Sequence, residues 1–208
     1  MNIYILKTGE RENELIPFLS EQRRQAVSDI KNAVVRREKI YAYALLRLAL
    51  REYGISEPPV FNYGEHGKPF IHNSNIHFSI SHAGGRTACV VSNYPIGLDI
   101  QDVRPLKADI SGKICTPDEL ERVRNSSDPD FEICRLWCIK ESVGKLSGKG
   151  FSEGFTGIES EKRIKDGLTF VQYENGFFTA VSSESPIFSV VRSEIGDGEL
   201  FSGLEKLK

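Results

Sequence analysis

The sequence predicts an α+β fold built from two similar subdomains. A long helical pattern followed by several strand-like runs occurs twice along the 208 residues. Hydrophobic residues make up 39% of the chain and charged residues 27%, which is enough apolar material for a buried core. No low-complexity linker separates the two units, and Tyr94-Pro95 is the expected boundary. The subdomains expected on this basis are residues 1–95 and 96–208.

The first unit opens with a strand at 2–6, where NIYIL is rich in strand-forming residues. Apolar positions from Val34 to Ala49 recur with helical spacing, so a helix is predicted over 28–53 with Gly54 as its stop signal. Turn-rich segments then separate short runs typical of strands. These runs lie at 60–63, 76–81, 87–92 and 95–101.

The second unit repeats this order. Pro117 at the first turn predicts a short helix over 116–124, because proline lacks only an N–H that is unused there. A stronger helix is predicted over 131–146, ending at Gly148 and Gly150. Strands are expected after it, at 155–158, 168–173, 177–182 and 187–192.

Composition narrows the class of protein. A formal net charge of −2 argues against nucleic acid as a partner. The chain has no stretch of about 18 uncharged apolar residues and no secretory signal, so a cytoplasmic protein without a membrane segment is expected. Free thiols are the default in that compartment. This expectation applies to Cys89, Cys115, Cys134 and Cys138.

The segment GLDIQ at 97–101 is the first candidate for chemistry. Strand alternation puts Asp99 and Gln101 on one face and turns Leu98 and Ile100 toward the core. Two oxygen-bearing side chains at i and i+2 can hold a hard cation such as magnesium, which prefers few protein oxygens plus water and phosphate. Taken alone, the pattern also fits an ordinary half-exposed strand.

The segment WCIKESVGK at 137–145 is the second candidate. On a helix, Trp137, Glu141 and Lys145 lie four residues apart and share a face. The two charged groups can place a metal ligand or base beside a phosphate-binding cation. They can equally form a surface ion pair worth about 0.3–0.5 kcal/mol. Trp137 is expected to pack and fix the helix.

The segment FSISHAGGR at 78–86 is the third candidate. A strand ends in Ser81-His82 and runs into a Gly-Gly turn, where backbone amides can approach an anion and His82 and Arg86 can add donors. Upstream, Gly67-Lys68-Pro69 puts a lysine in a rigid turn. Each feature taken singly also has a purely structural explanation.

The order of these motifs, GKP, FSISH, GLDIQ and WxxKExxxK over residues 67–145, resembles the 4′-phosphopantetheinyl transferase superfamily and its Sfp-type branch. That resemblance implies two α+β halves in a pseudo-twofold arrangement, with the active site between them. It implies Asp99 as the principal Mg²⁺ ligand, Glu141 as a second ligand and general base, and Lys145 as the cation that neutralises the pyrophosphate of coenzyme A. Gln101 is the third candidate ligand.

The resemblance also assigns residues to coenzyme A. His82 with Ser81 would bind its phosphates, and Lys68 with Pro69 would border its adenine. Basic residues on and before the long helix would hold the 3′-phosphate. The candidates are Arg23, Arg24, Arg36, Arg37 and Lys39, of which Arg23 and Arg37 are preferred. A register anchored on Arg47 puts the family arginine at Glu38, so this assignment shifts by one residue.

Two residues depart from the family pattern. Gln101 stands where an acidic residue is common, so it offers oxygen without charge. Ala83 replaces the last serine of an SHS motif, which removes one hydroxyl. Asp102 is expected on the opposite face from Gln101, and Glu119 is a secondary candidate because the family also tends to carry a glutamate there.

The reaction implied is transfer of phosphopantetheine from coenzyme A to a serine of an apo acyl, peptidyl or polyketide carrier protein, by an enzyme expected to be a monomer. Fatty-acid and secondary-metabolism pathways both use such carriers, and the sequence does not choose between them. Three alternatives stay open. One is a weakened member that only binds coenzyme A or a carrier, and another is an interaction module. The third, a metal-dependent nucleotide hydrolase, has against it the lack of GxxxxGK[ST] and GxGxxG loops.

Overall fold

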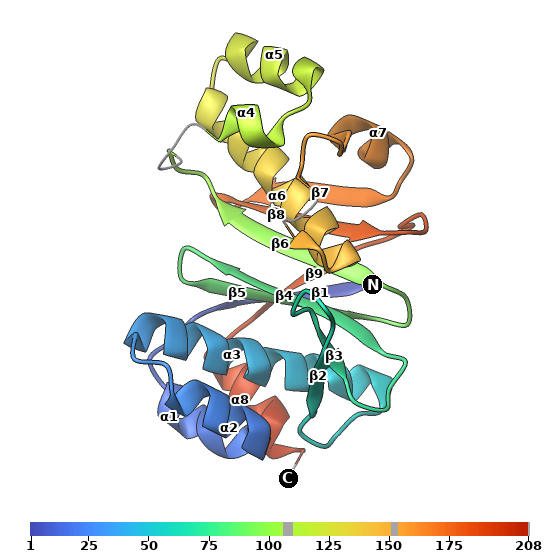
Figure 1. Cartoon of the computed structure of the whole chain (residues 1–208). Helices are drawn as coiled ribbons and strands as arrows, with labels where there is room; N and C mark the ends of the chain where they lie inside the picture. Colours follow the sequence, from blue (N-terminus) through green and yellow to red (C-terminus); the bar gives the residue numbers. More distant parts are fainter. Residues whose placement is uncertain (106–109, 151–153, 208) are drawn as a thin grey trace.

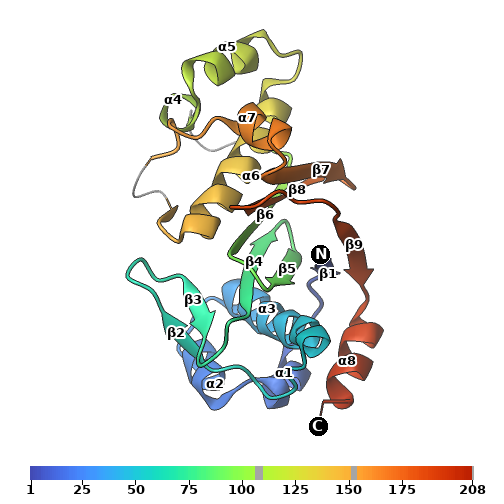
Figure 2. The same ribbon diagram turned by 90° about the vertical axis from the view of Figure 1, so that its right-hand side faces the viewer.

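The computed structural model describes residues 1–105, 110–150 and 154–207. Two α+β halves lie one above the other, each with a sheet toward the middle of the molecule and helices on the outside (Figures 1 and 2). In the part of the chain described, no helix has the length and apolar character needed to cross a membrane.

The first half contains the sheet with strand order β4-β5-β1-β9, covered by α3. Asn32 caps α3 by accepting hydrogen bonds from the amides of Val34 and Val35. The elements of the first half in chain order are β1 Asn2–Lys7, α1 Glu12–Leu15, η1 Ile16–Phe18, α2 Glu21–Ser28, α3 Ala33–Leu50, η2 Arg51–Tyr53, β2 Phe61–Tyr63, β3 Pro69–Ile71, β4 His77–Ala83 and β5 Arg86–Ser92.

The second half contains the sheet β6-β8-β7 and the long helix α6. Thr116 and Glu119 form a capping box at the start of α5. Gly148, in the left-handed conformation, ends α6, as expected from sequence. The remaining elements are β6 Ile96–Asp102, α4 Ser111–Ile114, α5 Pro117–Asn125, α6 Pro129–Ser147, α7 Ser160–Lys165, β7 Thr169–Glu174, β8 Phe177–Ser183, β9 Val191–Ile195 and α8 Asp197–Glu205.

The two halves share one topology, which confirms the predicted α+β fold of two similar units. In each half a strand leads to a long helix and then to a hairpin. The second hairpin strand pairs antiparallel with the opening strand, giving β4-β5-β1 and β7-β8-β6. The four cysteines are buried and free, as expected, and burial raises the pKa of each thiol.

Several predicted boundaries were wrong. The helix expected over 28–53 starts later than predicted, because Ser28 is the last residue of α2 and α3 begins only after the Asn32 cap. Residues 155–158 form a turn instead of a strand. The last predicted strand is shifted to β9, which pairs parallel with β1. After the second half the chain returns to the first half, where β9 and α8 pack. A single boundary at residue 95 does not describe this return.

The two sheets meet through a shared apolar layer and through adjoining edge strands. Side chains of β1, β5, β6 and β8 form one core cluster, which contains Leu98 and Ile100 as predicted. The edge strands β4 and β6 are joined by serines of β4. The hydroxyl of Ser79 accepts from the amide of Leu98 at 2.9 Å, which satisfies a donor on an otherwise open strand edge.

Gly97 allows α6 to lie directly on β6. A Cβ atom at this position would sit 2.0 Å from the carbonyl oxygen of Ser142 and 2.4 Å from the amide nitrogen of Leu146. No side chain fits in that space. The close approach brings the middle of α6 within reach of the side chains that follow Gly97 on β6.

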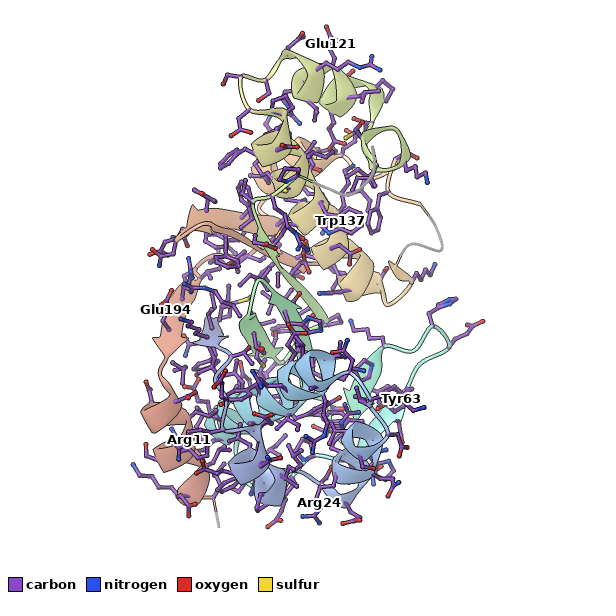
Figure 3. All side chains as sticks on the ribbon, turned by 90° about the vertical axis from the view of Figure 1, so that its left-hand side faces the viewer. Arg11, Arg24, Tyr63, Glu121, Trp137 and Glu194 are labelled. Atoms are coloured by element: carbon purple, nitrogen blue, oxygen red, sulfur yellow. The ribbon has the colours of Figure 1, made fainter. Side chains whose placement is uncertain are left out.

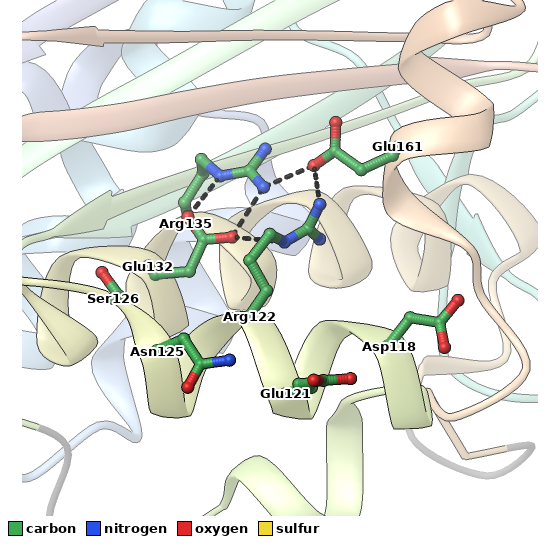
Figure 4. A pocket seen from close by; sticks show the side chains of 8 residues that line it. All are labelled: Asp118, Glu121, Arg122, Asn125, Ser126, Glu132, Arg135 and Glu161. Carbon is green, nitrogen blue, oxygen red and sulfur yellow. Dashed lines mark hydrogen bonds and ion pairs between the residues drawn. The ribbon is translucent and has the colours of Figure 1, made fainter.

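The outer helices of the second half are linked by charged side chains. Arg122, Glu132, Arg135 and Glu161 form a network between α5, α6 and α7, around a hollow of about 730 Å³ (Figure 4). Both arginines of the hollow already pair with Glu132 and Glu161, and Asp118 and Glu121 add further negative charge to its lining, so the hollow does not suit an anionic ligand. The network instead fixes the helices around α6.

Candidate active site

A cavity of about 550 Å³ lies where β4 and β6 meet α3 and α6. Trp137 of α6 and Tyr63 of β2, which lie in different halves (Figure 3), both line it. The other lining residues are Arg23, Lys39, Ala42, Tyr43, Ile80, Ser81, His82, Asp99, Ile100, Gln101, Glu141 and Lys145. The site thus lies between the halves, and Trp137, Glu141 and Lys145 share one helix face, as predicted.

Asp99, Ser81 and Lys145 form a closed set of hydrogen bonds in the cavity wall. The ammonium of Lys145 donates to Asp99 Oδ1 and to Ser81 Oγ, both at 2.7 Å. The hydroxyl of Ser81 donates to the same Oδ1 at 2.7 Å. Ser81 was predicted as a phosphate contact, but here its hydroxyl holds the carboxylate and the ammonium in place.

The second oxygen of Asp99 is available for a cation. Asp99 is only 5% exposed, and among the described residues its Oδ2 has no hydrogen-bond partner. A buried, unpartnered carboxylate oxygen is costly unless a ligand completes it. Glu141 lines the same cavity and is electrostatically coupled to Asp99.

Gln101 faces the cavity on the same side of β6 as Asp99. Its Nε2 donates to the carbonyl oxygen of Asp102 at 2.9 Å, so its amide is anchored while Oε1 carries the remaining acceptor capacity. The described residues contain no cluster of three His, Cys, Asp or Glu suited to a metal. Two carboxylates and an amide nevertheless fit Mg²⁺, which keeps several waters and takes few protein ligands.

Glu141 lies in an environment that opposes its ionisation. Burial raises the pKa of the Glu141 carboxyl, the nearby charge of Asp99 raises it further, and Lys145 acts in the opposite direction. A carboxyl with this shift is a stronger base when ionised than an ordinary one. A bound cation would favour its ionised form.

Replacing Glu141 with Gln is expected to stabilise the metal-free protein near neutral pH. A carboxyl whose pKa is raised by folding stabilises the fold below its unfolded pKa and loses that contribution as pH rises through its folded pKa. The variant escapes that loss. Thermal unfolding with a chelator should therefore show a higher Tm for the variant than for wild type, and this difference should widen as pH rises above the ordinary glutamate pKa of about 4.3. A gap that does not change with pH would contradict this account.

Arg23 of α2 is the cation that the first half places best in the cavity lining for binding an anion. It is 8% exposed, its guanidinium carbon lies 3.4 Å from the centre of the Tyr43 ring, and its Nη1 donates to the Tyr63 hydroxyl at 2.9 Å. No described carboxylate lies within ion-pair distance of it, and its Nε has no partner among the described residues. A buried guanidinium held only by aromatic rings is suited to an anion.

The other predicted basic residues are less well placed. Lys39 lines the cavity, but Arg37 faces Glu10 and Glu12 at 3.7 and 3.3 Å and is not part of the lining. Arg24 forms an exposed ion pair with Glu21. The geometry therefore favours Arg23 and Lys39 over Arg37.

Lys68 connects the two halves. Its ammonium donates to the carbonyl oxygens of Leu146 and Ile96 at 2.8 and 3.3 Å, so its charge is held by backbone. Together with Pro69 it lines an adjoining pocket of about 290 Å³, which shares Ile80 and Lys145 with the main cavity. The stem of Lys68 and the ring of Pro69 can border a ligand, whereas the ammonium of Lys68 is already used.

Glu119, the secondary candidate, is structural. Its carboxylate pairs with Lys140 at 2.7 Å, with exposed side-chain fractions of 5% and 0%. It also accepts from the amides of Thr116 and Ser160. This buried set fixes α6 one residue before Glu141 and lies away from the cavity lining.

Features of the site that sequence reasoning missed depend on contacts between distant segments. These are the aromatic cage of Tyr43 and Tyr63 around Arg23, and the contact between His82 and Glu38. No local pattern signals either of them. The sequence showed Gly97 in GLDIQ, but it did not show why a glycine is needed there, which is the close contact with α6.

The chain is similar to known proteins of one family. A model of the 4′-phosphopantetheinyl transferase superfamily matches residues 95–191. A 4′-phosphopantetheinyl transferase of Bacillus subtilis is 31% identical over 153 residues, 71% of this chain and 67% of that protein. One from Bacillus pumilus is 28% identical over 148 residues, 69% of this chain and 64% of that protein. Enterobactin synthase component D of Escherichia coli is 38% identical over 110 residues, 51% of this chain and 52% of that protein.

Proposed function

Because the chain belongs to the 4′-phosphopantetheinyl transferase superfamily, we propose that it moves the 4′-phosphopantetheinyl group of coenzyme A onto a serine of an apo carrier protein. Adenosine 3′,5′-bisphosphate is the leaving group. The single observation that carries this assignment is one cavity lined by Asp99, Glu141 and Lys145 and also by the basic side chains of Arg23, Lys39 and His82. Such a cavity suits a ligand with phosphate groups at two places.

The residues proposed to hold Mg²⁺ are Asp99 through Oδ2, Glu141 and Gln101. When bound, the ion supplies positive charge to the pyrophosphate oxygens on which negative charge accumulates. Lys145 is the protein's own cation at this end. Its ammonium already lies 2.7 Å from Asp99 Oδ1, and the residue lines the cavity, so it can contact both the carboxylate and a phosphate.

Glu141 is the proposed general base. It accepts the proton of the carrier's serine hydroxyl, directly or through one water. The serine oxygen then bonds to the phosphorus that bears pantetheine, and the bond from this phosphorus to the 5′-phosphate oxygen of the nucleotide breaks. Lys145 and Arg23 stabilise the phosphates of the leaving group, so positioning and electrostatics supply most of the rate enhancement.

The test is intact-mass measurement of an apo carrier incubated with the protein, coenzyme A and Mg²⁺. The carrier should gain one phosphopantetheinyl group, and adenosine 3′,5′-bisphosphate should appear in equal amount. A carrier with its acceptor serine changed to alanine is the matched control and should gain nothing. If acyl and peptidyl carriers all stay unmodified while coenzyme A binds, the protein is a binding module and the proposal fails.

A further inference from the structure

A carboxylate, that of Glu38, stands against the imidazole of His82, a residue of the cavity lining. Glu38 Oε2 lies 3.5 Å from His82 Nδ1, and the exposed side-chain fractions are 16% for Glu38 and 45% for His82. Ala42, one helical turn after Glu38 on the same face of α3, lines the cavity, as does His82 itself. The negative charge is therefore close to any ligand that contacts the imidazole.

The charge of Glu38 is directed at this one group. The neighbouring Arg37 faces Glu10 and Glu12, on another side of the helix. Among the described residues, His82 is the only ion-pair partner of Glu38, so no permanent cation neutralises this carboxylate. Beside such a carboxylate, an imidazole offers less net positive charge to a ligand than it would alone.

If the donor is coenzyme A, as the proposed function states, its phosphate groups occupy two places: the reacting pyrophosphate and the 3′-phosphate of the ribose. The reacting pyrophosphate must lie beside Lys145 and the carboxylates of Asp99 and Glu141. The cavity cations remaining for a phosphate on the ribose are Arg23, Lys39 and His82. A 3′-phosphate among them adds two negative charges near Glu38, whereas a 3′-hydroxyl adds none.

We propose that Glu38 sets the donor specificity of this enzyme by disfavouring the ribose 3′-phosphate. Arg23 and Lys39 line the cavity and attract that phosphate. The carboxylate of Glu38, which lies beside His82 of the lining, repels it. The enzyme therefore uses 3′-dephospho-coenzyme A nearly as well as coenzyme A. Glu38 thus acts on the part of the donor that leaves, not on the reacting atoms.

Two nucleotides that differ only in the 3′-phosphate provide the direct test. Calorimetric titration with adenosine 3′,5′-bisphosphate and with adenosine 5′-monophosphate compares wild type with Glu38→Gln. The variant should bind the bisphosphate about a hundredfold more tightly, as expected when one unit charge acts on two negative charges roughly 6 Å away at an effective dielectric constant of about 40. Its affinity for the monophosphate should change by less than about twofold. Equal changes for both nucleotides, or no change, would overturn the proposal.

Glu57→Gln is the matched control, because it removes one exposed carboxylate from the same half outside the cavity lining. It should leave both affinities unchanged. In turnover, the ratio of kcat/KM for coenzyme A to that for dephospho-coenzyme A should rise about a hundredfold in Glu38→Gln, through KM. If neither donor is used by the wild type, the proposed function fails, yet the nucleotide titration still decides the role of Glu38.

Discussion

Asp99→Ala is expected to lower the rate of transfer by about a thousandfold or more while the protein remains folded. The change removes the cavity carboxylate whose Oδ2 is unpartnered among the described residues, and it frees Lys145 from its 2.7 Å contact. Lys145 is 30% exposed in its side chain, so its ammonium can be hydrated when Asp99 is lost. The rate is measured by intact mass of the carrier, and folding by circular dichroism and thermal unfolding.

Asp102→Asn is the matched control for Asp99→Ala. Asp102 ends the same strand and is not part of the cavity lining. Its carboxylate faces the exposed Arg104 at 3.5 Å and accepts from Gln101 Nε2 at 3.3 Å, a contact that the Oδ1 of asparagine can keep. The variant keeps the size of the side chain and should transfer at close to the wild-type rate. Wild-type turnover by a folded Asp99→Ala protein would refute the assignment of this carboxylate to the reaction.

Lys140→Met is expected to cost about 3–5 kcal/mol of folding free energy, because it leaves the Glu119 carboxylate buried without its cation. The ammonium of Lys140 is fully buried, pairs with Glu119 at 2.7 Å, and donates to the carbonyl oxygen of Phe155 at 3.0 Å. All of these contacts are lost together. Urea unfolding monitored by fluorescence of the single tryptophan, Trp137, measures the loss.

The exposed ion pair of Lys162 with Asp166, at 2.5 Å, supplies the control. Lys162→Met should cost far less than Lys140→Met, because the carboxylate of Asp166 stays hydrated when its partner is lost. Adding Glu119→Leu to Lys140→Met should restore only part of the stability, since the amides of Thr116 and Ser160 would lose their acceptor. If Lys140→Met and Lys162→Met cost the same, burial would not be what makes the first pair important.

Features encoded by local patterns could be predicted from the sequence. Strand alternation placed Asp99 and Gln101 on one face, and both line the cavity. Helical spacing placed Trp137, Glu141 and Lys145 together, which the same cavity bears out. The helix start at Pro117 and the helix end at Gly148 followed from the residues preferred at helix termini. Each of these depends on residues within about one or two turns, which a single segment contains.

Boundaries and irregular segments were predicted less well. The Asn32 cap that separates α2 from α3 was hidden inside a continuous helical pattern. The return of β9 and α8 to the first half has no local signal, because strand partners are chosen by shape and burial across the whole fold. The same reason explains why one boundary at residue 95 did not describe both halves.

The sequence by itself determined the two α+β units, the faces of β6 and α6, and the order of the motifs. Only the tertiary structure decided which groups meet. It joined Ser81 and Lys145 to one oxygen of Asp99, enclosed Arg23 between two tyrosines, committed Lys68 to backbone carbonyls and set Glu38 against His82. Periodicity tells which way a side chain points from its own element. Its partners depend on how closely elements distant in sequence approach, and at Gly97 that distance is set by the absence of a single Cβ atom.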